Sequence, residues 1–277
     1  MAEHRWAAGS RPARNGSRQR MTDGVPRILA LWSAPRCRST AFFRMMLERG
    51  DFRVVHEPFS NLAEFGEVSV AGTTVSSEPA VLARLRELGN AGAVFFKDTT
   101  DESYPAVLAD AAFLAEDAVH AFLIRSPRET IASYFRLNPE VRAEQIGFGH
   151  QLELFEAVRA ATGRPPFVMD AERLLTDPTA VIAAFCAAVG IEFRPAALTW
   201  QPGHREEWGP SQRWHEEVSR TSGFGAVRPA RTAEALIAGN PRLVAILADQ
   251  QPFYERLLEH AWRPAGDPAD EIAGLCR

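Results

Sequence analysis

The chain is predicted to fold as an α/β domain in which a parallel sheet is flanked by helices on both faces. Five short apolar runs of strand length alternate with segments of helical character between residues 27 and 258. Three of these segments begin at a polar residue followed by proline, the pattern of a helix N-cap with proline in the first turn. Strands that alternate with helices are typical of parallel sheets. No internal repeat is visible.

Each predicted strand is a short apolar run bounded by polar or turn-forming residues. The runs are residues 27–32, 52–56, 93–96, 119–124 and 166–169. Residues 41–47 have helical character and stop at Gly50. Further helices are predicted after Ser126 and Pro127, from Asp177 and Pro178 through Val189, and from Asn240 and Pro241 through Leu258.

The composition indicates a soluble, well-cored chain. Its 277 residues are 46% hydrophobic and carry a formal net charge of -4. No apolar run approaches the roughly 20 residues of a membrane helix, and the mildly acidic total disfavours bulk attraction to nucleic acid or membranes. The cysteines, Cys37, Cys186 and Cys276, are far apart and form neither a disulfide framework nor a metal-ligand cluster. We therefore expect a cytoplasmic protein with no metal, nucleic-acid or membrane partner.

The chain divides into a short tail and one domain. Residues 1–26 lack apolar periodicity and are expected to be a disordered basic tail, with Met21 as an alternative start to Met1. Residues 27–277 are expected to form a single domain. Within it, residues 199–229 are rich in Trp, Gly, His and charge without period, which favours a long functional loop or lid. The richness in Arg, Ala and Pro is bacterial-looking, and it leaves Lys97 as the one lysine among 31 basic residues.

Polar side chains follow four of the predicted strands at the point where each strand ends. They are residues 33–40, His56 with Glu57, Lys97 with Asp98, and Arg125 with Ser126. Ligands of open parallel sheets bind beyond the carboxyl ends of the strands. The four groups are therefore expected to converge on one site.

Residues 33–40 have the length of a phosphate-binding loop that opens a helix, whose N-terminal amides favour an anion. The nucleoside triphosphate version has glycine at the first and sixth places and lysine at the seventh, where this chain has Ser33, Arg38 and Ser39. Thr40 keeps the hydroxyl of the eighth place, and Arg36 brings positive charge. An ordinary turn with a Ser/Thr cap is the alternative interpretation.

The end of the fourth strand offers a second anion site. Arg125 is followed eight residues later by Ser133, about two helical turns into the next helix. A guanidinium fork and a hydroxyl at that spacing can bind a phosphate. The alternatives are a helix-end ion pair for Arg125 and a hydroxyl bonded to its own helix for Ser133.

Taken together, residues 33–40 and 125–134 resemble the corresponding segments of the sulfotransferase superfamily. In that family the first segment binds the 5′-phosphosulfate of 3′-phosphoadenylyl sulfate (PAPS) and the second binds its 3′-phosphate. The resemblance spans roughly residues 27–229 and implies a P-loop-like fold. It implies PAPS-dependent transfer of a sulfuryl group to a hydroxyl of a small-molecule acceptor, without a metal, with adenosine 3′,5′-bisphosphate as product.

The resemblance also implies a set of PAPS-binding residues. These are Arg36, Cys37, Arg38, Ser39, Thr40, Arg125, Ser133 and Arg228. Arg36 stands where the family has a lysine, and its guanidinium cannot donate a proton to the leaving group. Ala171 replaces a tyrosine that lies near the adenine in many members, and Phe224 is a candidate neighbour of that base.

The catalytic residues implied by the resemblance are Glu57, Lys97 and Arg36. Many cytosolic members carry a histidine base after the third strand, but this chain has Asp98 and Thr99 there. Other branches place a glutamate shortly after the first helix, so Glu57 is the predicted general base, with His56 and Asp98 as alternatives. Lys97 and Arg36 would stabilise charge on the leaving phosphate. A cap or ion-pair role for Glu57, and a lysine that merely extends along an apolar wall, are the competing interpretations.

The sequence is also compatible with two other functions. A P-loop kinase acting on a small molecule would require ATP and magnesium, and the missing loop glycine and lysine count against it. A non-catalytic nucleotide-binding module would bind its ligand without turnover. Trp208 and Trp214 are interpreted as part of an acceptor lid, because their spacing with His204 and His215 matches no known metal-ligand motif.

Overall fold

A parallel sheet of five strands lies at the centre of the computed structural model, which describes residues 21–22, 25–225 and 231–266. The strand order is β4-β7-β3-β8-β9, and every neighbouring pair is parallel. The strands are β3 (Ile28–Ser33), β4 (Arg53–His56), β7 (Val94–Thr99), β8 (Ala118–Ile124) and β9 (Phe167–Asp170). All five coincide with the predicted apolar runs, and the predicted α/β class is confirmed.

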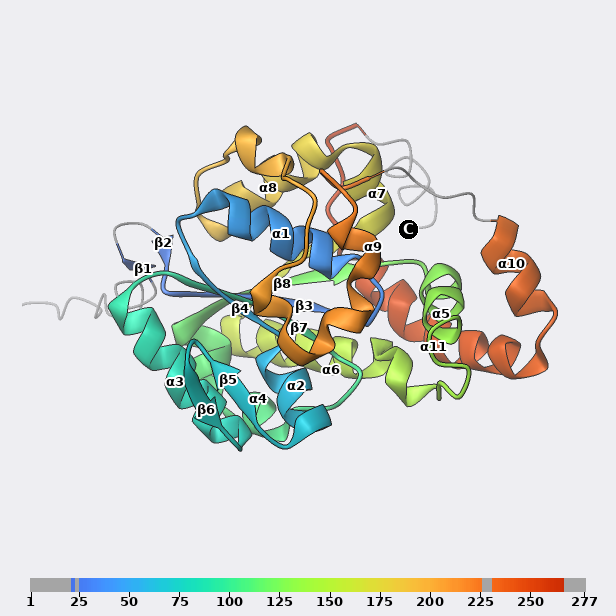
Figure 1. The fold of residues 1–277 in the computed structure, drawn as a ribbon, viewed down its shortest axis with the longest axis horizontal. Coiled ribbons are helices and arrows are strands. Elements are labelled where there is room, and N and C mark those ends of the chain that lie inside the picture. The colour runs from blue at the N-terminus through green and yellow to red at the C-terminus, as the bar shows by residue number, and fades with distance from the viewer. Residues whose placement is uncertain (1–20, 23–24, 226–230, 267–277) are drawn as a thin grey trace, which may run out of the picture.

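Helices cover both faces of this sheet, as Figure 1 shows. On one face lie α1 (Ser39–Arg49), α7 (Ala171–Thr176) and α8 (Pro178–Val189). On the other lie α2 (Pro58–Phe65), α3 (Glu78–Ala91), α4 (Pro105–Ala109) and α6 (Phe148–Thr162). To the right of the labelled strands in Figure 1 lie α5 (Pro127–Phe135), α10 (Arg231–Ala238) and α11 (Pro241–Leu258), which pack against one another. Among the described helices, none combines the length and apolar character that a membrane span requires.

The helix starts predicted from polar-proline pairs are confirmed, with one difference in how they are capped. The Asp177 carboxylate accepts from the Ala180 amide, and the Asn240 side chain accepts from the amides of Arg242 and Leu243. Ser126 occupies the N-cap position of α5, but its side chain makes no capping hydrogen bond. The start of α5 therefore depends on the preset backbone of Pro127.

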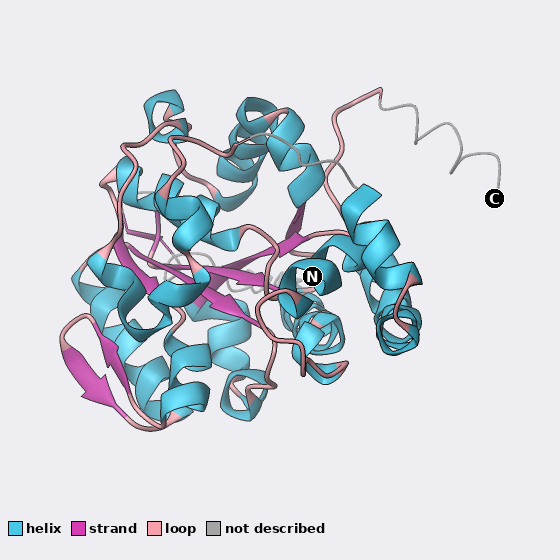
Figure 2. Cartoon of the chain, turned by 45° about the vertical axis from the view of Figure 1, so that its right-hand side comes forward, coloured by secondary structure: helices cyan, strands magenta, loops and turns pink. Residues whose placement is uncertain are grey.

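Shorter elements complete the described chain. A hairpin of β5 (Val68–Val70) and β6 (Thr73–Val75) stands at the edge of the molecule beside α2 and α3 (Figure 2). Single turns occur as a π-helix at Phe113–Asp117 and as 3₁₀ helices at Glu144–Ile146 and Pro195–Leu198. Of the predicted tail, β1 (Met21–Thr22) and β2 (Val25–Pro26) form a short antiparallel pair. Residues 1–20 and 23–24 lie outside the described residues.

The sheet register brings the ends of four strands to one place. Ser33 at the end of β3 pairs with Thr99 of β7 and with Leu123 of β8. His56 at the end of β4 pairs with Lys97. The polar residues that follow these strands therefore share one edge of the sheet, as predicted.

Candidate active site at the carboxyl edge of the sheet

The phosphate loop, residues 33–40, turns sharply between β3 and α1. Arg36 and Arg38 both have left-handed backbone conformations, with φ of 65° and 67°, which cost non-glycine residues of order 1–3 kcal/mol each. Arg38 is the N-cap residue of α1 and makes no side-chain capping bond, so the alternative of a Ser/Thr cap is wrong. The first amides of a helix have no intrahelical acceptor. The start of α1 is consequently suited to bind an anion.

Arg36 joins this loop to the helix that follows β8. Its Nε donates to Ser133 Oγ at 3.2 Å, and its Nη1 donates to the Trp214 carbonyl at 2.8 Å. Burial lowers the pKa of the guanidinium, while Glu217 and Glu57 oppose this. Two predicted PAPS-binding residues that lie 97 positions apart in the chain are thus in direct contact.

Arg125 lies just before α5 and contacts the same loop. Its Nη1 donates to the Arg36 carbonyl at 3.0 Å, and its Nη2 donates to Glu129 at 3.2 Å. Its Nε lies 3.6 Å from a Glu172 oxygen. Burial, with help from Asp170, raises the pKa of Glu172 to about 7 against the opposing effect of Arg125. Arg125 therefore has the ion pair that was its alternative interpretation, in a position that still borders the loop.

Cys37 contributes to the loop as a buried thiol. Burial raises its pKa to about 12, so no thiolate forms near neutral pH. Its Sγ lies 3.8 Å from Thr130 Oγ1 in α5. Its amide donates to the Ala34 carbonyl at 3.4 Å. Ser39 and Thr40 are buried at the start of α1.

Residues 206–219, named the lid segment because they lie within the predicted lid at 199–229, contact the loop. The lid segment comprises the 3₁₀ turns of Glu206–Trp214, which break at Gly209, and α9 (Glu216–Ser219), drawn in orange in Figure 1. His215 lies between these two parts, and its Nδ1 is 3.0 Å from Thr40 Oγ1. Its Nε2 is 3.3 Å from Ser211 Oγ. The sequence indicated a lid here but not that His215 reaches the loop.

Aromatic rings pack within and beside the lid segment. Trp208 is fully buried, with its ring 5.3 Å from His215 and 6.2 Å from His204 between centroids. Trp214 packs edge-on against Tyr134 at 5.8 Å. Phe224, the candidate adenine neighbour, is buried against Trp200 at 5.6 Å. Arg228 lies outside the described residues.

Glu57 follows β4 and opens α2 from a left-handed backbone position, with φ of 45°. Its amide donates to the Lys97 carbonyl at 2.7 Å, and the Lys97 ammonium donates to its carboxylate. Both side chains are buried, Lys97 being 1% and Glu57 9% exposed. Burial raises the pKa of Glu57, but Lys97, His56 and His215 outweigh it, so the net pKa is below its usual value. Glu57 thus has its alternative ion pair, with Lys97 as partner.

The two alternative bases have different surroundings. Asp98 accepts hydrogen bonds from the amides of Phe59, Ser60 and Thr99 at 2.7, 3.1 and 2.9 Å. Two of these amides belong to the first turn of α2 and the third to β7, so backbone donors occupy the carboxylate. Burial raises the pKa of Asp98. His56 is buried, and neither ring nitrogen has a hydrogen-bond partner among the residues that the structure describes. Burial lowers the pKa of His56 well below its usual value, so the ring is neutral.

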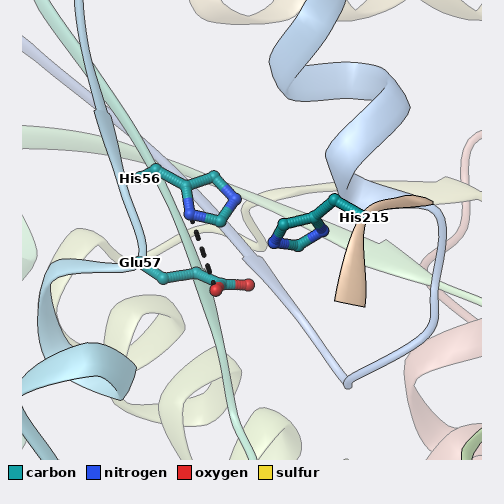
Figure 3. A group of neighbouring side chains, drawn as sticks. All are labelled: His56, Glu57 and His215. Atoms are coloured by element: carbon teal, nitrogen blue, oxygen red, sulfur yellow. Dashed lines mark ion pairs between the residues drawn. The ribbon is translucent and has the colours of Figure 1, made fainter. Parts of the chain in front are cut away.

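His56, Glu57 and His215 face one another across the site (Figure 3). One nitrogen or oxygen from each lies within 4.8 Å of the others, and His56 Nδ1 is 3.6 Å from Glu57 Oε2. Two imidazoles and a carboxylate are donor types that can hold a metal ion. However, Lys97 already pairs with Glu57, and Lys97 and Arg36 both act on His215 as positive charges. This electrostatic setting favours an anion over a further cation.

A separate cleft of about 340 Å³ lies at the amino ends of β8 and β9. Its lining includes His120, Phe167, His260 and Trp262. Ligands of open parallel sheets bind at the opposite, carboxyl edge. The convergent charged groups, rather than this cleft, therefore define the candidate site.

A family profile described as "Sulfotransferase domain" matches residues 26–257, which include the loop, the four strand ends and the lid segment. The chain belongs to the sulfotransferase domain family. Two curated proteins of Arabidopsis thaliana are similar to this chain. Branched-chain-amino-acid aminotransferase-like protein 2 is 25% identical over 211 residues, and the like-named protein 1 is 26% identical over 213. The matches cover 72% and 73% of this chain but only 36% and 37% of those proteins.

Three solved sulfotransferase structures are also similar to this chain. They are the sulfotransferase domain of the Synechococcus olefin synthase, that of the curacin biosynthetic pathway, and a sulfotransferase from Alicyclobacillus acidocaldarius. Their TM-scores are 0.46, 0.44 and 0.44 at 15%, 12% and 14% identity. The matches cover 80%, 81% and 80% of this chain and 93%, 97% and 95% of those chains.

Proposed function

We propose that this sulfotransferase moves the sulfuryl group of PAPS to a hydroxyl of a small-molecule acceptor. The observation that carries the proposal is the hydrogen bond from Arg36 Nε to Ser133 Oγ. It places the loop after β3 beside the helix after β8, so two groups suited to bind phosphate are neighbours. A nucleotide with anionic groups on both its 5′ and 3′ oxygens complements such a pair.

In the proposed step the bond between sulfur and the bridging oxygen of PAPS breaks while the acceptor oxygen bonds to sulfur. The bridging oxygen keeps the electron pair, and the acceptor proton passes to the Glu57 carboxylate. Transfer of this kind depends on placement and charge stabilisation more than on covalent help. Arg36, the first amides of α1 and the Lys97 ammonium supply the positive charge.

Lys97 has two successive partners in this proposal. In the structure it pairs with Glu57. As charge develops on the bridging oxygen, the ammonium turns toward it and away from the carboxylate. Burial alone raises the pKa of a carboxylate, so Glu57 becomes more basic in the same step in which the acceptor loses its proton.

The proposal extends to Arg228 and the lid. Residues 221–229 resemble the family's loop that closes over the nucleotide, which supports Arg228 as a further PAPS contact. We also propose that residues 27–277 act as one domain with residues 199–229 as its lid. An Arg228→Ala variant with unchanged affinity for adenosine 3′,5′-bisphosphate would contradict the Arg228 assignment.

The first test is thermal unfolding with adenosine 3′,5′-bisphosphate, with adenosine 5′-monophosphate and ATP with magnesium as controls. A ligand that binds only the folded state adds about 2.7 kcal/mol of stability at a hundredfold excess over its Kd. We expect a shift with the bisphosphate, a smaller one with the monophosphate, and a loss of that difference in Ser133→Ala. A shift with ATP and magnesium alone would indicate a kinase. Where the bisphosphate binds, labelled PAPS with a panel of alcohols and phenols then tests transfer, and binding without transfer would contradict the enzyme.

A further inference from the structure

Two consecutive residues of the lid segment occupy hydrogen-bond donors of the phosphate loop. The Trp214 carbonyl accepts from Arg36, and His215 Nδ1 lies 3.0 Å from the Thr40 hydroxyl. Arg36 and Thr40 are two of the groups through which the loop is proposed to bind phosphosulfate. Phosphate and sulfate oxygens are hydrogen-bond acceptors, so they require the same hydrogens that the lid holds.

The hydrogen-bond chain within the lid determines the direction of the contact between Thr40 and His215. Ser211 Oγ donates its single proton to the Trp208 carbonyl at 2.8 Å. Ser211 can therefore only accept from His215, which places the ring proton on Nε2. Nδ1 is then an acceptor, and the Thr40 hydroxyl donates to it. In this arrangement Thr40 has no proton to offer to an anion.

Because these groups are buried, the chain of hydrogen bonds from Thr40 through His215 to Ser211 has a single arrangement. His215 is 3% exposed, Ser211 2% and Trp208 0%. Burial lowers the pKa of His215 to about 3, against the opposing pull of Glu57, so the ring is neutral at ordinary pH. A neutral imidazole has one donor and one acceptor, and both are in use.

We propose that His215 is a positioning residue for the PAPS site. Its imidazole holds the Thr40 hydroxyl until a bound anion takes the place of the imidazole as acceptor. This inference rests on the proposed function, because it needs an anion that binds the phosphate loop. The lid and the anion then compete for Thr40 and Arg36. Removing the Nδ1 acceptor removes part of that competition, and the anion binds more tightly.

Two substitutions of similar shape distinguish the roles of the two ring nitrogens of His215. His215→Asn keeps an acceptor at the place of Nδ1, whereas His215→Gln keeps a polar group at the place of Nε2 and leaves Thr40 free. Calorimetric titration of the full chain with adenosine 3′,5′-bisphosphate measures the effect. We expect about 3- to 10-fold tighter binding in His215→Gln, the range for one neutral hydrogen bond. His215→Asn should bind like the wild type.

Two further variants, Thr40→Val and Ser211→Ala, test the contact between Thr40 and His215 independently. In Thr40→Val, His215→Gln should have no further effect on the Kd, because the hydroxyl for which the two compete is absent. Ser211→Ala leaves the His215 ring in place but removes the acceptor at Nε2, so the ring proton can move to Nδ1. That change frees the Thr40 proton and should also tighten binding. It keeps the test available where His215→Gln does not fold.

The outcomes separate this inference from the proposed function. Weaker binding in His215→Gln, or equal binding in His215→Gln and His215→Asn, would overturn the positioning role while the PAPS site stands. A direct ligand role for His215 predicts that weakening. No binding of the bisphosphate by the wild type or any variant would overturn both proposals.

Discussion

The Lys97 ammonium and the Glu57 carboxylate form a buried ion pair between the ends of two neighbouring strands. Register places His56 opposite Lys97, and the Glu57 amide donates to the Lys97 carbonyl, so backbone and side chains join the same two residues. Glu57 has a left-handed backbone conformation at the N-cap position of α2. A buried ion pair is a weak source of stability. Its position beside the phosphate loop favours a role in the reaction.

Glu57→Gln tests the proposed base. We expect sulfuryl transfer to fall by about 10²- to 10⁴-fold, the usual contribution of general-base catalysis. Affinity for adenosine 3′,5′-bisphosphate should change little. Stability should fall by about 3–5 kcal/mol, because Lys97 loses its buried counter-charge. Turnover per bisphosphate-binding site, measured beside urea unfolding, separates these effects. Near-complete turnover with unchanged affinity would reject Glu57 as the base.

Lys97→Met tests the second half of the pair. Without the ammonium the leaving oxygen loses a charge partner, and we expect transfer to fall by about 10²- to 10³-fold. Burial then acts on Glu57 without Lys97 to oppose it, so the pKa of the carboxylate rises. The acid limb of the pH-rate profile should move to higher pH in the variant.

Lys97→Arg is the matched control for that substitution. It keeps the charge and should return the acid limb toward that of the wild type, even where the altered geometry slows transfer. An intact transfer rate in Lys97→Met would contradict the role of the ammonium.

The strands of this fold could be predicted because their apolar runs are short, buried and bounded by polar residues. Convergence of the strand ends then follows from the parallel sheet alone. The helices α2, α3 and α6 were not predicted. Pro58 comes two residues after the predicted strand at 52–56, and it is the first residue of α2. The hairpin at residues 68–75 was not predicted either. Its sequence does alternate between apolar and polar residues, and Gly72 in the turn has a φ of 82°.

The site was predictable only where side chains follow a strand. Arg36 and Glu57 follow β3 and β4, Lys97 lies near the end of β7, and the helix after β8 contains Ser133. The structure brings these four residues together in two contacting pairs. His215 lies 175 residues from Thr40 in the chain, and no periodic pattern connects them. Asp98 was an alternative base because of its position in the sequence. In the structure, however, its carboxylate accepts hydrogen bonds from three backbone amides. Such assignments depend on tertiary contacts that motifs do not encode.

Glu172→Gln tests the negative charge beside Arg125. The pKa of Glu172 is raised to about 7, so the wild-type carboxylate ionises as pH rises through neutrality. With the 3′-phosphate placed at Arg125 as proposed, an ionised Glu172 would repel that phosphate and compete for Arg125, which lies 3.6 Å away. Wild-type affinity for adenosine 3′,5′-bisphosphate should therefore weaken several-fold relative to the variant between pH 6 and 8.

Comparison of the two proteins at each pH cancels the ionisation of the nucleotide itself. The same titration with adenosine 5′-monophosphate is the control, because that ligand has no 3′-phosphate near Glu172. A constant ratio of the two Kd values across pH would contradict the placement of the 3′-phosphate at Arg125.

The buried histidine His120 predicts how stability depends on pH, independently of the proposed reaction. Its Nδ1 accepts from Trp32 Nε1 at 3.0 Å, so its Nε2 donates to the Phe113 carbonyl at 3.1 Å. Burial lowers its pKa to about 4, so between pH 6.5 and 4 the unfolded chain binds a proton that the folded chain does not. Unfolding free energy should therefore fall as pH decreases through this window, by up to about 1.4 kcal/mol per pH unit for this group. His120→Asn keeps an acceptor for Trp32 but does not titrate, and urea unfolding should show a correspondingly shallower slope. An identical slope in wild type and variant would show that His120 is already protonated in the folded protein.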